Sequence, residues 1–187
     1  MKLVLAPMEG VVDFKMRQLL TNIGGFDLCV TEFVRVIDKC LPAKVFHRYC
    51  PELDNNGLTK AGTPVRVQLL GQVADVLAEN AVRAIELGSH GIDLNFGCPA
   101  KTVNKSRGGA VLLKDPDHMY DIIKAVRDAV DSKHQVSAKI RLGFDDDSKS
   151  QEIVDAVVSA GADSIAIHAR TKRDGYNPPA YWGKIPP

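Results

Sequence analysis

At the centre of the chain stands the stretch Gly91-Ile92-Asp93-Leu94-Asn95-Phe96-Gly97-Cys98-Pro99, a short strand that runs into a turn. Polar and apolar residues alternate along it, so the strand has one polar and one apolar face. Glycine permits a sharp turn and proline fixes the backbone after the thiol, so Asn95 and Cys98 are presented together where the strand ends. A buried structural cysteine is the alternative, because free cysteines are among the most buried residues.

Six runs with strand character recur along the chain, and helical stretches separate most of them. The strand-like runs are Leu3–Met8, Leu28–Phe33, Val65–Leu70, Ile92–Phe96, Val136–Leu142 and Ser164–Arg170. The helical patterns are Asp13–Thr21, Asp75–Leu87, Asp117–Val130 and Ser148–Ala160. Strands that alternate with helices predict a parallel sheet, which is either a barrel or an open doubly wound sheet.

Polar residues near the far ends of several strands favour the barrel. No Gly-x-Gly-x-x-Gly motif follows the first strand, which weakens the dinucleotide-binding alternative. A (β/α)8 barrel collects its active site from the ends of many strands. We therefore predict an α/β fold, a (β/α)8 TIM barrel that is incomplete here. Eight strand–helix units usually need about 250 residues, so we expect about six strands in these 187 residues, without the last two units.

Side-chain alternation predicts that Gln68, Asn95, Lys139 and His168, from four different strands, meet at one mouth of the barrel. If the apolar face of each strand packs on the outer helices, these four side chains point inward. A packed barrel interior is normally apolar and branched, so inward polarity indicates a ligand. An antiparallel sheet with one solvated face would alternate similarly, but the intervening helices argue against it.

Composition fits one domain with a substantial core. Hydrophobic residues make up 45% and charged residues 25% of the chain, as in ordinary soluble proteins. The 24 basic and 23 acidic residues nearly cancel, so net charge alone would not hold a nucleic acid, although a local basic patch could. No run has the length of a membrane span, and the N-terminus turns acidic too soon for a signal peptide. We expect a cytoplasmic protein without membrane contact.

The cysteine pattern indicates no metal site and no disulfide framework. Cys29, Cys40, Cys50 and Cys98 form no Cys-x-x-Cys pair, and none has a histidine at metal-ligand spacing. Zinc sites and disulfide scaffolds normally show such spacing. We therefore expect no metal in the site.

Motifs at the ends of successive strands resemble the tRNA-dihydrouridine synthase family. The matching segments are Ala6–Gly10, Val67–Gly71, Leu94–Pro99, Lys139–Gly143 and His168–Thr171, with Lys101 and the Arg107–Ala110 turn. Each motif alone is weak or moderate, but together they run in order over nearly the whole chain. Thr31–Val36 and Lys44–Arg48 resemble the bacterial C-type synthases, which act at position sixteen of tRNA.

The resemblance implies FMN-dependent reduction of a specific uridine in the tRNA D-loop to 5,6-dihydrouridine, with NADPH as reductant. It implies that residues 1–187 are the N-terminal portion of an FMN-binding barrel catalytic domain. The family's FMN-phosphate residues on the last two strands, and its C-terminal helical domain, would lie outside this portion. We expect the full-length protein to be a monomer that binds tRNA.

The resemblance also assigns roles to individual residues. Cys98 would be the catalytic acid, since an ordinary thiol is mostly protonated at neutral pH. The residues expected to hold FMN are Pro7, Met8, Glu9, Gln68, Lys139 and His168. The residues expected to contact the uracil or the tRNA are Arg35, Asn95, Lys101, Arg141 and Tyr176. Lys101 as a plain surface lysine and His168 as a satisfied core histidine stay open as alternatives.

Two other functions stay open. One is a flavin-dependent oxidoreductase of free pyrimidines, because dihydroorotate-type dehydrogenases share the barrel and a cysteine–proline pair at a strand end. The other is an inert or RNA-binding fragment, because the phosphate-holding strands are not among the six that we expect.

Overall fold

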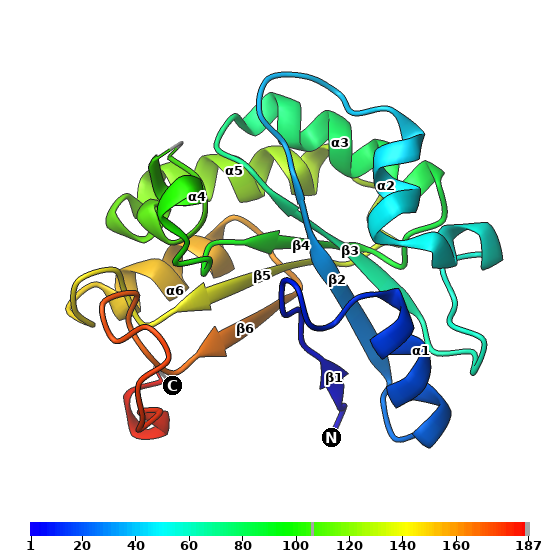
Figure 1. The fold of residues 1–187 in the computed structure, drawn as a ribbon. Helices are drawn as coiled ribbons and strands as arrows, with labels where there is room; N and C mark the ends of the chain where they lie inside the picture. Colours follow the sequence, from blue (N-terminus) through cyan, green and yellow to red (C-terminus); the bar gives the residue numbers. More distant parts are fainter. Residues whose placement is uncertain (106, 186–187) are drawn as a thin grey trace.

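The computed structural model describes residues 1–105 and 107–185, and its centre is one sheet of six parallel strands (Figure 1). The strands are β1 (Val4–Leu5), β2 (Leu28–Arg35), β3 (Val65–Leu70), β4 (Ile92–Asn95), β5 (Val136–Arg141) and β6 (Ser164–His168). Each strand pairs in parallel with the next one along the chain. The strands therefore lie side by side in chain order, with β1 and β6 as the two edges of the sheet. The sheet is curled (Figure 1).

Helices connect the strands and lie on the outer side of the curled sheet (Figure 1). The α-helices are α1 (Phe14–Ile23), α2 (Ala43–Tyr49), α3 (Ala74–Glu86), α4 (Lys101–Lys105), α5 (Pro116–Ala129) and α6 (Ser150–Ser159). The 3-10 helices are η1 (Pro51–Asn55), η2 (Gly109–Lys114) and η3 (Trp182–Lys184). Among the helices in the described ranges, none combines the length and the apolar character needed to cross a bilayer.

The predicted fold class and its six strands are confirmed, with shifted ends. β3 has the predicted bounds, whereas β1 is much shorter than Leu3–Met8. The chain already turns at Met8, whose carbonyl accepts from the backbone nitrogen of Val12 at 2.9 Å. The four predicted helices are present as α1, α3, α5 and α6. The pattern did not predict α2, α4 or the 3-10 helices, which are too short to show a helical period.

The apolar faces of the strands form the core, as the alternation predicted. Val67 and Leu69 of β3 and Ile92 and Leu94 of β4 are almost fully buried. They share one hydrophobic cluster with side chains from α3 and α5. Because neighbouring residues of a strand point to opposite faces, packing this set against the helices turns the polar set toward the inside of the barrel.

A buried ion pair joins α1 to η1. The fully buried Arg17 donates to both oxygens of Glu52, at 2.8 and 2.9 Å. Its Nη1 donates to the carbonyl of Val12 at 3.1 Å, and the Nη2 that bonds Glu52 also donates to the carbonyl of Tyr49 at 2.9 Å. The bond to Val12 fixes the segment that follows Pro7–Glu9. This pair therefore holds one wall of the barrel mouth in place.

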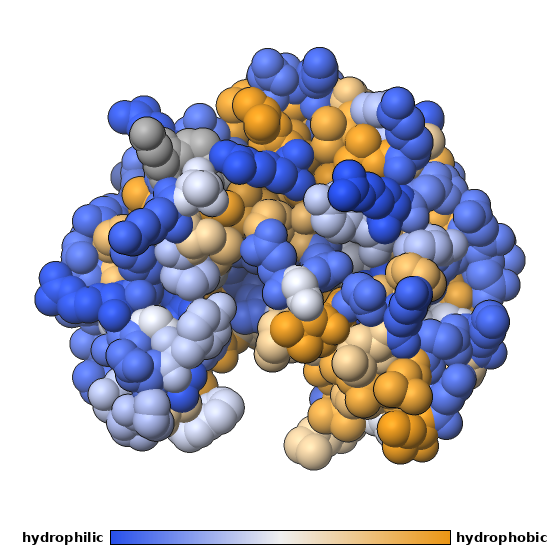
Figure 2. Space-filling view, viewed as in Figure 1, coloured by the Kyte–Doolittle hydropathy of each residue, from blue (hydrophilic) through white to orange (hydrophobic). Residues whose placement is uncertain are grey.

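The surface is hollowed between the part built on β1 and α1 and the part built on the segment after β6 (Figure 2). Apolar side chains gather over β1 and α1 in the same view. The exposed ones there are Leu3, Val4, Phe14, Leu19 and Ile23. An uncovered apolar strand edge is typical of a sheet that has not closed into a barrel.

Replacing Glu52 by alanine should lower the free energy of unfolding by about 3–5 kcal/mol, because Arg17 would remain buried without a counter-charge. Urea denaturation measures this loss. The matched control is Glu86→Ala, whose exposed carboxylate meets Arg83 at 3.3 Å, and which should cost less than about 1 kcal/mol. Equal losses for the two variants would contradict the anchoring role of Arg17.

Candidate active site

A cavity of about 770 Å³ opens at the carboxyl ends of the strands. Its lining comes from all six strands or from the segments that directly follow them. Every residue expected to carry function lines it except Arg35. Those lining residues are Pro7, Met8, Glu9, Gln68, Asn95, Cys98, Lys101, Lys139, Arg141, His168 and Tyr176. The structure thus brings together side chains that lie far apart in the sequence.

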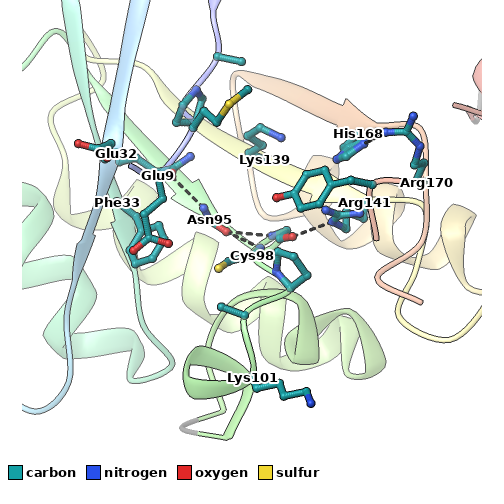
Figure 3. A pocket seen from close by; sticks show the side chains of 18 residues that line it. Glu9, Glu32, Phe33, Asn95, Cys98, Lys101, Lys139, Arg141, His168 and Arg170 are labelled. Atoms are coloured by element: carbon teal, nitrogen blue, oxygen red, sulfur yellow. Dashed lines mark hydrogen bonds between the residues drawn. The ribbon is translucent and has the colours of Figure 1, made fainter. Parts of the chain in front are cut away.

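The cavity has two sides and a floor (Figure 3). Glu32 and Phe33 lie on one side, and Arg141, His168 and Arg170 lie on the other. Asn95, Cys98 and Lys139 lie between them. A flat ligand could therefore lie over the floor, with side chains of β2 on one side and side chains of β5, β6 and the segment after β6 on the other.

Glu32, Phe33 and Arg170 also line the cavity, although sequence reasoning assigned them no role. Arg170 shares the alternating face of His168, so that signal was present. Glu32 and Phe33 are neighbours, and strict alternation allows only one of them to face inward. The pairing of β2 with β3 shifts between Val30 and Phe33, and such an irregularity locally breaks the alternation.

The turn after β4 holds the thiol in place. Asn95 Oδ1 accepts from the backbone nitrogens of Gly97, at 3.0 Å, and Cys98, at 2.9 Å. The carbonyl of Cys98 accepts from the backbone nitrogen of Ala110 at 3.0 Å. Gly109 has a φ of +65°, and a Cβ there would lie 2.9 Å from the same carbonyl. Only glycine fits this close approach without a shift of the turn.

Cys98 is 9% exposed, and its thiol holds its proton at neutral pH. Burial raises the pKa of Cys98, and the charge of Glu9 raises it further. The hydrogen bond from the backbone of Ala100 and the charges of Arg141 and Arg35 lower it, without cancelling the effect of burial. A protonated thiol can donate a proton but is a poor nucleophile.

Lys139 is a half-buried cation that faces the cavity. Burial lowers the pKa of Lys139, and the charge of Arg141 lowers it further, whereas the charge of Asp93 raises it. Within residues 1–105 and 107–185, no hydrogen bond or ion pair is formed by its ammonium group. A desolvated cation without an acceptor fits a ligand that brings negative charge or carbonyl oxygens.

Arg141 ties the cysteine turn to the segment after β6. It is 2% exposed, and its Nε donates to the carbonyl of Gly97 at 2.8 Å. Its Nη1 donates to the carbonyls of Thr171, at 3.0 Å, and Gly175, at 2.9 Å. The guanidinium also lies 5.3 Å from the ring centre of the exposed Tyr176. Most of its donors are thus used by backbone carbonyls, so Arg141 stabilises the position of the cysteine turn relative to the segment after β6.

His168 is neutral in this environment. Its Nε2 lies 3.0 Å from Nη1 of Arg170. Arginine can only donate, so Nε2 accepts and Nδ1 carries the hydrogen. Burial and the nearby charges of Arg141, Lys139 and Arg170 lower the pKa of His168 to about 4. The Nδ1 hydrogen is the group that His168 can offer to a ligand.

Arg35 and Lys101 lie at the rim. Arg35 is exposed at the end of β2, and its Nη2 donates to the carbonyl of Thr102 on α4 at 3.4 Å. Lys101 is exposed at the start of α4. In the part of the chain that the structure describes, no group of three or more His, Cys, Asp or Glu side chains could hold a metal ion.

Comparison with known sequences gives a family match over nearly the whole chain. The profile of the dihydrouridine synthase (Dus) family matches residues 4–186. The chain is 62% identical over 185 residues to the tRNA-dihydrouridine(16) synthase of Shewanella oneidensis and 60% identical over 186 residues to that of Haemophilus influenzae. These alignments cover 99% of the chain but only 59% and 60% of the relatives. The chain therefore spans less than two thirds of their length.

Comparison with solved structures supports the fold alone. The carboxyl transferase domain of Rhizobium etli pyruvate carboxylase superposes on 90% of this chain and 27% of its own, with a TM-score of 0.53 and 15% sequence identity. At this identity only the architecture is comparable. The likeness is consistent with an incomplete TIM-barrel-like fold.

The imidazole of His168 should titrate near pH 4, well below the ordinary value of about 6.5. The unfolded chain then takes up this proton first, so the contribution of His168 to stability is lost as the pH falls from about 6.5 toward 4. NMR titration of the imidazole measures the midpoint. Arg170→Leu should raise it, because a neighbouring cation and donor is removed. A wild-type midpoint near 6.5 would contradict this environment.

Proposed function

This chain belongs to the dihydrouridine synthase family, and we propose that the full-length protein reduces a uridine of the tRNA D-loop to 5,6-dihydrouridine. We further propose that it acts at position sixteen and uses FMN and NADPH. One observation carries the proposal. A protonated thiol and an ammonium group that has no partner among the described residues face one cavity, in a chain about 60% identical to proteins named tRNA-dihydrouridine(16) synthase.

The cavity fits FMN by its size and its chemistry. A volume of about 770 Å³ lies in the range of cofactor pockets. Pro7 and Met8 supply an apolar wall, and Gln68 supplies an amide for the pyrimidine edge of the ring. Lys139 places a positive charge beside the cavity, where it would stabilise an electron-rich ring system. His168 offers its Nδ1 hydrogen to the ribityl or phosphate end.

Bound FMN would supply the hydride for the C5–C6 double bond of uracil, and NADPH would restore the reduced cofactor. Hydride addition leaves negative charge on the uracil ring, and a proton must then reach the neighbouring carbon. Cys98 is the acid in this proposal, because its buried thiol keeps its proton at neutral pH. Lys139 stabilises the negative charge that develops in the cavity. Asn95 suits the uracil edge, because an amide offers both a donor and an acceptor.

The rim fits an RNA partner. A base inside a barrel mouth must leave its stack, as other base-modifying enzymes require. Arg35 and Lys101 are exposed beside the opening and can meet phosphates. Tyr176 is 72% exposed, so its ring can stack on a base. The guanidinium of Arg141 lies against this ring, so Arg141 would contribute to tRNA binding by holding Tyr176 in position.

The wild-type full-length protein should form dihydrouridine in unmodified tRNA when NADPH is supplied, and it should leave free uracil and orotate unreduced. The reason is that Arg35, Lys101 and Tyr176 at the rim can contact the phosphates and bases of a tRNA, whereas a free pyrimidine inside the cavity would not reach them. Nucleoside mass spectrometry of the digested tRNA measures the product. Reduction of free pyrimidines instead would favour the second oxidoreductase function, and no turnover with any substrate would favour an inert protein.

Cys98→Ala should lower kcat by at least about 10²-fold, the usual contribution of a positioned general acid. The visible flavin absorbance of the purified variant should match that of the wild type, because the proposal places the thiol against the uracil and assigns FMN binding to other residues. Cys40→Ala is the matched control, because Cys40 is exposed and outside the cavity, and its kcat should be unchanged. Full turnover by Cys98→Ala would exclude the acid role.

A further inference from the structure

One layer below the cavity, a carboxylate lies inside the barrel. Asp93 of β4 is 3% exposed, and its two oxygens accept from different side chains. Oδ1 accepts from Ser137 Oγ at 2.5 Å, and Oδ2 accepts from Gln68 Nε2 at 2.7 Å. Ser137 in turn accepts from Nη1 of Arg66 at 2.9 Å. The proposed chemistry gives Asp93 no part, yet it is expensive to bury a carboxylate.

The backbone forces the orientation of the two amides that lie between Asp93 and the thiol. The backbone nitrogens of Gly97 and Cys98 can only donate, so Asn95 must turn its oxygen toward them. Asn95 Nδ2 then faces Gln68, which must present Oε1 there, at 2.8 Å. Gln68 therefore turns Nε2 toward Asp93. This sequence of hydrogen bonds has to end on an acceptor, and the carboxylate is that acceptor.

We propose that Asp93 is a positioning residue for the Cys98 thiol, acting through a relay of two amides. Its carboxylate selects one orientation of Gln68, Gln68 selects one orientation of Asn95, and Asn95 holds the turn that carries the thiol. The same carboxylate decides which amide atoms of Gln68 remain for a ligand. The value of this positioning for catalysis rests on the proposed function, whereas the relay itself does not.

Two isosteric substitutions reverse the relay. Asn95→Asp still accepts from the turn, but it places a second carboxylate against Gln68. The amide oxygen of Gln68 must then face one of two carboxylates, and the repulsion displaces the turn. Adding Asp93→Asn removes the conflict, because the introduced amide can donate to Gln68 and the inverted Gln68 can donate to the introduced carboxylate. Ser137 keeps an acceptor for its hydroxyl hydrogen in this arrangement.

The experiment measures the rate at which iodoacetamide alkylates Cys98 in the full-length wild type, in Asn95→Asp and in the double variant. Peptide mass spectrometry gives the rates, and the exposed Cys40 is the reference inside each molecule. The ratio of the Cys98 rate to the Cys40 rate should be about tenfold higher in Asn95→Asp than in the double variant. Both carry the same new charge beside the thiol, so this charge does not explain the difference.

Equal Cys98 ratios in Asn95→Asp and in the double variant would overturn the relay. If Asn95→Asp does not fold, Asp93→Ala takes its place, with an expected rise of about tenfold in the same ratio. Its control is Thr59→Ala, which removes another buried polar group, one that accepts from the backbone nitrogen of Thr63 at 3.2 Å, outside the cavity and away from Cys40. An unchanged ratio in Asp93→Ala, or an equal rise in Thr59→Ala, would also overturn the relay.

Turnover provides a second readout. Asp93→Ala should lower kcat by about tenfold and leave the KM for tRNA within about threefold, because the thiol moves while the rim stays. Asp93→Asn should recover most of the lost kcat, because its amide oxygen can still accept from Gln68. Failure of this rescue would overturn the relay. A wild type that forms no dihydrouridine would overturn the proposed function, and the alkylation rates would still decide the relay.

Discussion

Six parallel strands turn their polar residues into the curled sheet, and each polar group buried there needs a hydrogen-bond partner. This constraint shapes the interior from the bottom upward. Arg66, Ser137 and Asp93 satisfy one another in the lower layer. Gln68 and Asn95 continue the same network up to the cavity. The turn that carries Cys98 is thus held from below by the side chain of Asn95, in addition to the hydrogen bond from the backbone of Ala110 to its carbonyl.

The same constraint separates structural groups from chemical ones. Arg141 has its nitrogens largely occupied by backbone carbonyls, so it braces the site. Lys139 faces the cavity without a partner among the described residues, and His168 keeps its Nδ1 hydrogen free for a ligand because Arg170 occupies Nε2. Groups that lack partners in a desolvated place are the ones that a ligand can satisfy.

Electrostatics inside the cavity points in one direction. Burial, together with the charges of Arg141, Lys139 and Arg170, lowers the pKa of His168 to about 4. This cationic side lies across the cavity from Glu32 (Figure 3). In the proposed reaction, a ring that gains negative charge is favoured on the cationic side. The protonated Cys98 lies between the two sides, where a proton donor is needed.

Local sequence determined the order of strands and helices, the parallel sheet and the polar set that faces inward, because a period of two and the helical period are properties of neighbouring residues. It also brought Gln68, Asn95, Cys98, Lys139 and His168 to one mouth. Tertiary structure alone decided the inward turn of Glu32 beside Phe33, the bracing role of Arg141 and the part of Asp93. Each of these depends on strand register or on hydrogen bonds between residues far apart in the chain, which no local pattern records.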